Sequence, residues 1–192
     1  MTTYRVFIAA ELPPTVRAEL ARAQEQLRRG NPPVKWVAPT AMHLTLRFLG
    51  ETDVALLPAL GTALRTALAG HARMTLQLTS AGAFPNMRRP SVVWAGVGGS
   101  TGAIERAAAA IETQVAALGF PRESRPFRAH LTMGRVRREA TPAQLERLGE
   151  AIRSLPPLAP AAWTVERVVL FRSELRGSGP VYTELDSVPL AE

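Results

Sequence analysis

Two copies of one short pattern, His-x-Thr-x, carry the chemistry that this sequence offers. They are His43-Leu44-Thr45-Leu46 and His130-Leu131-Thr132-Met133. Residues two apart on a β-strand point to the same face, so each copy sets an imidazole beside a hydroxyl. A neutral imidazole can take a proton from an attacking group while an imidazolium protonates a leaving oxygen, and threonine hydroxyls can hydrogen-bond to anionic oxygens. The pattern therefore favours in-line attack on a phosphodiester.

Other catalytic chemistries find little support among the residue types present. The chain has no cysteine and three histidines, which excludes a thiolate zinc site, a disulfide scaffold and a cysteine nucleophile. Two imidazoles alone are an incomplete zinc shell, and no serine nucleophile accompanies them, so we expect neither a metal nor a cofactor. The glycine-rich stretch 96–102 has the wrong spacing for a dinucleotide loop and suits a tight turn into a helix. The third histidine, His71, lacks a threonine partner and is expected at the surface.

Apolar periodicity predicts the elements that must position the two motifs. We expect strands at 4–9, 34–37, 43–48, 74–78, 91–97, 128–134, 163–171 and 181–185, and helices at 14–29, 52–69, 101–118 and 141–155. The order repeats, because His43 and His130, and likewise Pro14 and Thr101, are 87 residues apart. The repeat predicts two β-α-β-α-β units.

A chain of 192 residues is expected to form one domain, and the repeat suggests that this domain has two lobes. We expect lobe-forming repeats at about 1–83 and 90–172, joined by the loop 84–90 and followed by a C-terminal strand segment, 173–192. If the lobes face each other, two histidines and two threonines converge in the cleft between them.

The charge distribution favours an anionic polymer as partner. The net charge is +7, and residues 122–138 hold six arginines against one glutamate, a net +5 beside His130. Phosphates of a polynucleotide would be attracted there, although a merely solvated basic surface has the same composition. Four aromatic residues could stack on a base or pack in the core: Phe48, Phe127, Trp36 and Trp94. Alternation along its strand places Phe48 on the apolar face.

No apolar run approaches the roughly 18 residues that span a bilayer, and the apolar stretch near the first residue is too short for a signal peptide. We therefore expect a cytoplasmic protein that does not bind membranes. We also expect it to be a monomer.

With both motifs in view, the chain resembles the 2H phosphoesterases, specifically the bacterial RNA 2′,3′-cyclic phosphodiesterases (the LigT-like, or 2′-5′ RNA ligase, branch). The similarity covers nearly the whole sequence. It rests on Arg5-Val6-Phe7-Ile8-Ala9 with Leu12-Pro13, on His43 to Gly50, on Phe127 to Arg135, and on Gly179-Pro180-Val181-Tyr182. One departure is Ala129, where the family commonly has proline.

The resemblance implies an α+β bilobal fold, with an antiparallel sheet in each lobe, helices outside and the active site in the cleft. It also implies metal-independent hydrolysis of RNA 2′,3′-cyclic phosphodiester ends to 2′-phosphomonoesters. His130 would accept the proton from water and His43 would donate one to the leaving oxygen, although this order can be reversed. Thr45 and Thr132 would hold the phosphate oxygens. Arg135 matches a substrate-binding position, but simple alternation turns it away from His130 unless a bulge intervenes.

Three alternatives remain at this point. The first is 2′-5′ RNA ligation, the reverse reaction, which the same two imidazoles could serve. The second is a related phosphodiesterase acting on cyclic nucleotides or 2′-5′ oligonucleotides. The third is an RNA-end binding module without catalysis, which the intact histidines and threonines disfavour.

Overall fold

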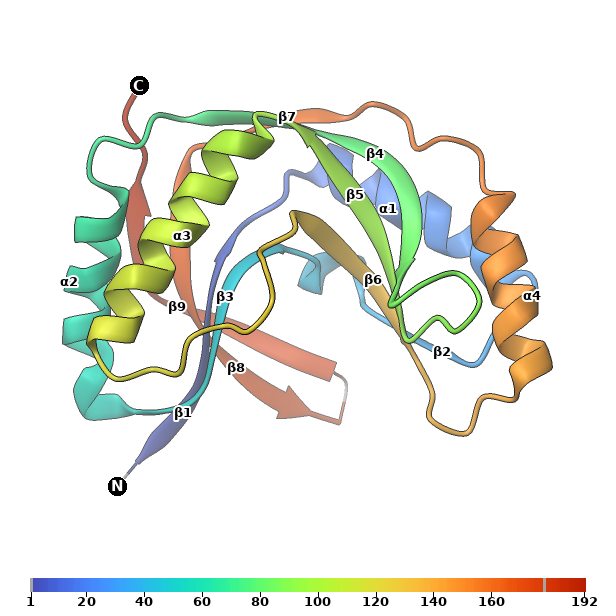
Figure 1. Cartoon of the computed structure of the whole chain (residues 1–192), viewed down its shortest axis with the longest axis horizontal. Coiled ribbons are helices and arrows are strands. Elements are labelled where there is room, and N and C mark those ends of the chain that lie inside the picture. Colours follow the sequence, from blue (N-terminus) through green and yellow to red (C-terminus); the bar gives the residue numbers. More distant parts are fainter. Residues whose placement is uncertain (1, 178) are drawn as a thin grey trace.

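In the computed structural model, which describes residues 2–177 and 179–192, the chain forms two antiparallel sheets with helices on their outer faces (Figure 1). The four-stranded sheet has the order β3-β1-β8-β9, and the five-stranded sheet has the order β2-β6-β5-β4-β7. The expected α+β architecture of two antiparallel sheets and outer helices is confirmed.

The first half of the chain follows the predicted order closely. Its elements are β1 (Thr3–Ala10), α1 (Pro14–Arg28), β2 (Val34–Trp36), a 3-10 turn (Pro39–Ala41), β3 (Leu44–Asp53), a second 3-10 turn (Val54–Leu56), α2 (Leu57–Leu68) and β4 (Met74–Phe84). The predicted helix over 52–69 begins late, because β3 continues to Asp53 and the side chain of Asp53 accepts a hydrogen bond from the Ala55 N–H.

The second half repeats the pattern and adds a hairpin. Its elements are β5 (Val92–Gly99), α3 (Thr101–Ala117), β6 (His130–Val136), α4 (Pro142–Arg153), β7 (Ala162–Val165), β8 (Arg167–Arg176) and β9 (Gly179–Pro189). Helix α4 begins with a capping box, in which Thr141 and Gln144 satisfy each other's backbone N–H groups. The single strand predicted over 163–171 is wrong, since β7 and β8 belong to different sheets.

Each half of the chain supplies strands to both sheets. In the first half, β1 and β3 join the four-stranded sheet, whereas β4 pairs with β5 in the five-stranded one. In the second half, β5 and β6 stay together and β8 returns to pair with β1. The ranges 1–83 and 90–172 therefore do not correspond to one sheet each, because β2 and β4 of the first range lie in the five-stranded sheet and β8 of the second lies in the four-stranded one.

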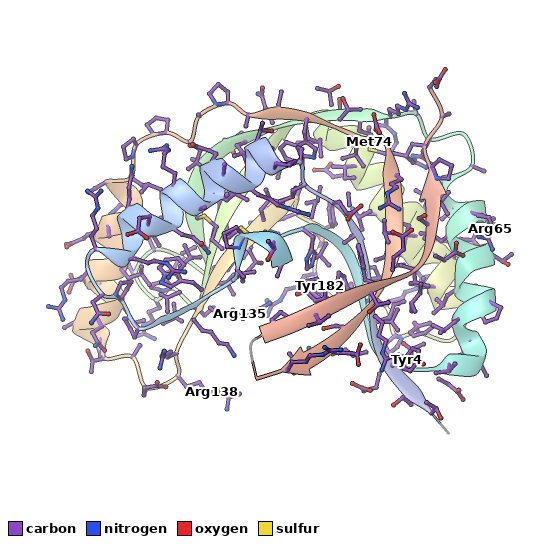
Figure 2. The ribbon with its side chains drawn as sticks, turned by 180° about the vertical axis from the view of Figure 1, so that it is seen from behind. Tyr4, Arg65, Met74, Arg135, Arg138 and Tyr182 are labelled. Carbon is purple, nitrogen blue, oxygen red and sulfur yellow. The ribbon has the colours of Figure 1, made fainter. Side chains whose placement is uncertain are left out.

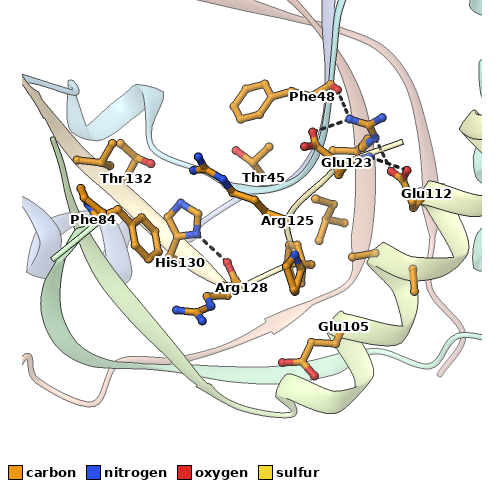
Figure 3. A pocket seen from close by; sticks show the side chains of 18 of the residues that line it. Thr45, Phe48, Phe84, Glu105, Glu112, Glu123, Arg125, Arg128, His130 and Thr132 are labelled. Carbon is orange, nitrogen blue, oxygen red and sulfur yellow. Dashed lines mark hydrogen bonds and ion pairs between the residues drawn. The ribbon is translucent and has the colours of Figure 1, made fainter. Parts of the chain in front are cut away.

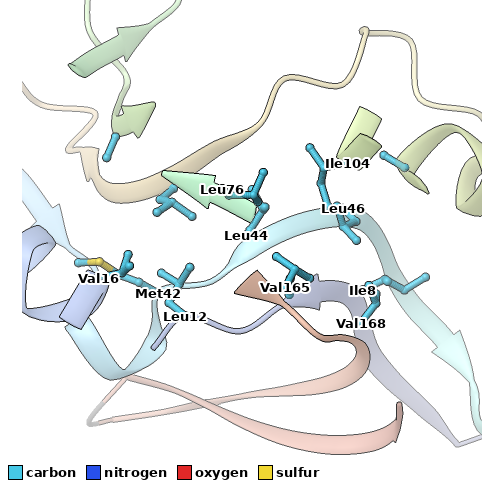
Figure 4. Close-up of a cluster of buried hydrophobic side chains, with 14 of the residues drawn as sticks. Ile8, Leu12, Val16, Met42, Leu44, Leu46, Leu76, Ile104, Val165 and Val168 are labelled. Atoms are coloured by element: carbon cyan, nitrogen blue, oxygen red, sulfur yellow. The ribbon is translucent and has the colours of Figure 1, made fainter. Parts of the chain in front are cut away.

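The helices divide in the same way and enclose one continuous core. Helices α2 and α3 cover the four-stranded sheet, and α1 and α4 lie on the side of the five-stranded sheet (Figure 1). A large hydrophobic cluster takes side chains from both sheets and from the helices, among them Ile8, Leu44, Leu76 and Val168 of the strands and Ile104 of α3 (Figure 4). This shared core holds β3 and β6, the strands of the two motifs, near each other. Among the described residues, no helix combines the length and apolar character needed to cross a membrane.

Candidate active site

The two histidines have the same local geometry. His43 Nδ1 lies 3.0 Å from the carbonyl oxygen of Ala41, and His130 Nδ1 lies 2.7 Å from that of Arg128. A carbonyl oxygen can only accept a hydrogen bond, so we assign the proton of each neutral imidazole to Nδ1. In both motifs this leaves Nε2, the outer nitrogen, available to exchange a proton with a bound molecule.

The two imidazoles differ in their surroundings. The His43 ring stacks on Phe7, with ring centroids 4.6 Å apart, and meets Tyr182 edge-on at 5.2 Å. Burial lowers the pKa of His43 from 6.5 to about 4, and the charge of the Arg17 guanidinium adds to the lowering. His130 meets Phe84 edge-on, with ring centroids 5.1 Å apart, and lines an open cavity. At neutral pH the substrate-free protein therefore holds His43 as neutral imidazole.

A cavity of about 850 Å³ lies beside these motifs and brings together Thr45, His130, Thr132 and Arg135. Figure 3 shows His130 and Thr132 towards one end of it and Glu105 and Glu112 of α3 towards the other. His43 is not among the lining residues. It precedes Thr45 by two positions and is covered by Phe7 and Tyr182.

A β-bulge in each motif decides which side chains enter the cavity. In β6, Trp94 and Val93 of β5 pair with Thr132 and Gly134, so Met133 is the extra residue. This bulge restores Arg135 to the cavity face, as the family resemblance required, because two residues of the bulged strand oppose one on its partner.

The corresponding bulge in β3 overturns one prediction. Ile8 and Ala9 of β1 pair with Arg47 and Thr45, which leaves Leu46 as the extra residue. Phe48, placed on the apolar face by alternation, is instead 50% exposed and lines the cavity. Phe127 lines the cavity as well, whereas Trp36 lies beneath the Arg28 guanidinium and Trp94 packs on Phe84.

Arg47 is a structural anchor of the site that the sequence argument did not single out. It is only 7% exposed, and its Nε lies 2.6 Å from Oε2 of Glu112 in α3. Its Nη1 donates to Glu123, at 2.6 Å, and to the Phe48 carbonyl, while Nη2 donates to the Pro121 carbonyl. Arg47 thus connects the first motif to the loop that leads into the second (Figure 3). Its place two residues after Thr45 was the available signal.

The basic segment 122–138 contributes to the cavity only in part. Arg125, Arg128 and Arg135 line it, and Glu123 lines it as well but forms an ion pair with Arg47. Within residues 2–177 and 179–192, no three His, Cys, Asp or Glu side chains gather as a metal site would require.

Comparison with protein families gives a match over residues 12–177 to the 2′-5′ RNA ligase superfamily. A protein of Methanothermobacter thermautotrophicus, named RNA 2′,3′-cyclic phosphodiesterase, is 32% identical over 184 residues, which cover 95% of this chain and 96% of its own length. A protein of the same name from Thermus thermophilus is 36% identical over 97% of this chain and 90% of its own length.

Solved structures agree with the sequence matches. A crystal structure of a Thermus thermophilus protein superposes with a TM-score of 0.77 at 34% identity and covers 97% of both chains. The structure of E. coli LigT complexed with 3′-AMP superposes with a TM-score of 0.78 at 26% identity over the full length of both chains. The arrangement of two sheets around a cleft is therefore shared with these proteins.

Proposed function

Because the chain belongs to the 2′-5′ RNA ligase superfamily, a group of 2H phosphoesterases, we propose that it hydrolyses RNA 2′,3′-cyclic phosphodiester ends to 2′-phosphomonoesters without a metal. The family resemblance noted from the motifs is confirmed, and relatives that match nearly the whole chain are named RNA 2′,3′-cyclic phosphodiesterase, which supports the proposal. The observation that carries the proposal is the repeated geometry of His43 and His130, each with Nδ1 bound to the carbonyl two residues earlier.

The proposed reaction is an in-line displacement at phosphorus. Water attacks opposite O3′, His130 Nε2 takes its proton, the P–O3′ bond breaks and His43 Nε2 protonates O3′. The hydroxyls of Thr45 and Thr132 donate hydrogen bonds to the non-bridging oxygens, whose negative charge grows in the transition state. All these residues belong to one chain, so we propose that a monomer is active.

The low pKa of His43 sets a condition on this assignment. At pH 7 its imidazole is neutral in the free protein, since burial lowers its pKa to about 4. A phosphate bound nearby favours the imidazolium, because an opposite charge raises the pKa of a histidine. His43 would therefore receive the proton that it later donates only when the substrate is bound.

The first experiment offers a labelled oligonucleotide with a 2′,3′-cyclic end to the wild type, H43A and H130A in the presence of EDTA. The wild type should give a 2′-phosphate, and each variant should lose about 100-fold to 10,000-fold in kcat. Circular dichroism and thermal melting establish that the variants are folded. Near-normal turnover in either variant would contradict the two-histidine mechanism, and a 3′-phosphate product would exchange the leaving group.

A second substrate separates the acid from the base. If sulfur replaces O3′ in the cyclic phosphate, the leaving thiolate needs no protonation. H43A should then regain most of its lost rate, whereas H130A should stay slow because water must still be deprotonated. The opposite pattern would reverse the two roles without affecting the reaction itself.

The remaining functions make different predictions in the same assay. A 2′-5′ ligase would join the cyclic end to a 5′-hydroxyl RNA in preference to water. An RNA-end binding module would bind the labelled RNA saturably and release no product. A phosphodiesterase for 2′-5′ oligonucleotides would cleave an internal 2′-5′ linkage faster than it opens the cyclic end.

A further inference from the structure

Two cationic side chains lie opposite each other on neighbouring strands of the five-stranded sheet. Lys35, the only lysine of the chain, lies on the edge strand β2 directly opposite Arg135 of β6. Directly opposed residues of antiparallel strands project from the same face. Val34 and Trp36 lie on the other face, where both would contact a Cβ placed on Gly134. Since Arg135 lines the cavity, Lys35 projects on the cavity side as well.

This arrangement is electrostatically unfavourable in the free protein. Like charges directly opposite each other on antiparallel strands are destabilising. Among residues 2–177 and 179–192, no carboxylate forms an ion pair with Lys35 or Arg135. Both side chains are exposed, so the pair is open to a ligand. An anion bound between them would turn the repulsion into two favourable contacts.

The pair lies next to the proposed reaction centre. Arg135 follows Thr132 by three residues and lines the same cavity. Tyr182 of β9, in the other sheet, lies close enough to Arg135 to be affected by its charge. This charge partly offsets the rise that burial causes in the pKa of Tyr182. Figure 2 shows the Arg135 side chain beside the β8–β9 hairpin that carries Tyr182. Tyr182 in turn contacts the His43 ring. An RNA strand that extends from the two histidines between the sheets therefore passes Lys35 and Arg135.

We propose that Lys35 and Arg135 bind the phosphate on O5′ of the terminal nucleotide. In an RNA chain, this phosphate joins the nucleotide that carries the cyclic end to the nucleotide before it. The inference rests on the proposed function and deepens it, because it makes an oligonucleotide end a better substrate than a nucleoside 2′,3′-cyclic phosphate. A nucleoside cyclic phosphate offers one phosphate, which occupies the site of the two threonines. The second phosphate of an RNA end is the natural counter-ion of the cationic pair.

The test compares two substrates that differ only in this phosphate: one nucleoside 2′,3′-cyclic phosphate with and without a 5′-phosphate. In low salt, the wild type should show a kcat/KM at least about tenfold higher for the 5′-phosphorylated substrate, and added salt should reduce that ratio. K35Q, which keeps a polar side chain one atom shorter but removes the charge, should lose most of the preference. K35R should retain it.

A control variant distinguishes a specific subsite from general attraction. Arg147 is exposed on α4, outside the cavity, so R147Q removes the same charge and should leave the preference unchanged. Thermal melting establishes that K35Q is folded. If the wild type hydrolyses both substrates without preference, or if K35Q lowers kcat/KM equally for both, the subsite is refuted while the hydrolysis stands. An equal effect of R147Q would also refute it. If neither substrate reacts, the proposed function has failed instead.

Discussion

Lowering the pH should destabilise this protein through His43, and replacing His43 with asparagine should remove that effect. Burial lowers the pKa of His43 from 6.5 to about 4 in the folded state, whereas the unfolded chain keeps the ordinary value. Below pH 6.5 the unfolded state therefore binds a proton that the folded state does not. The stability that His43 contributes is complete above pH 6.5 and is lost as the pH falls through 4.

The size of the effect follows from the two pKa values of His43. They differ by about 2.5, and each pKa unit corresponds to about 1.4 kcal/mol, so the complete loss is about 3 to 4 kcal/mol. About 3 kcal/mol of it is reached at pH 4, where half of the folded molecules still hold His43 neutral. H43N is the matched variant, because its amide nitrogen can replace Nδ1 as donor to the Ala41 carbonyl without titrating. Carboxylates such as Glu19, whose pKa is lowered by its hydrogen bond from Arg22, lose the same stability in both proteins.

The assay is urea unfolding of the wild type and H43N at pH 7, 5.5 and 4. The free energy of unfolding of the wild type, relative to H43N, should fall by about 3 kcal/mol between pH 7 and pH 4. An NMR titration of the histidine Cε1–H signals, with His43 assigned by its absence in H43N, gives the pKa directly. A difference independent of pH, or a His43 signal that titrates near 6.5, would refute the reasoning.

Two further variants test the architecture of the site. R47Q should lower the free energy of unfolding by about 3 kcal/mol, because it leaves Glu112 and Glu123 without their buried partner. Trypsin should then cut first in the released loop, at Arg122 or Arg128, and unchanged digestion would show that Arg47 does not hold the loop. T132V should lower kcat about tenfold to 100-fold with little change in KM, while T132S stays near the wild type. Equal activity of T132V and T132S would remove the hydroxyl from the mechanism.

The helices could be predicted because burial leaves a periodic trace in the sequence. The apolar stripe of α1, with Val16, Leu20, Ala23 and Leu27, is buried throughout, and the predicted bounds differ from the observed ones by a residue. The pairing of strands has no comparable periodic signal in the sequence. Whether β4 pairs within its own half or with β5 depends on the hairpin that joins them, and both pairings bury the same alternating face. The repeat can therefore be predicted from the sequence, whereas the assignment of strands from each half to both sheets cannot.

The bulges at Leu46 and Met133 show that the repeat contains information on side-chain direction that simple alternation does not. A bulge has no compositional signature, so counting from His43 placed Phe48 wrongly on the apolar face. The same counting from His130 would have turned Arg135 away from the cavity, and the family resemblance alone required a bulge there. The two bulges are also 87 residues apart, so the bulge that the resemblance requires in the second motif predicts one at the equivalent position of the first motif. Applied in that way, it places Phe48 and Arg135 at equivalent positions, and both side chains line the cavity.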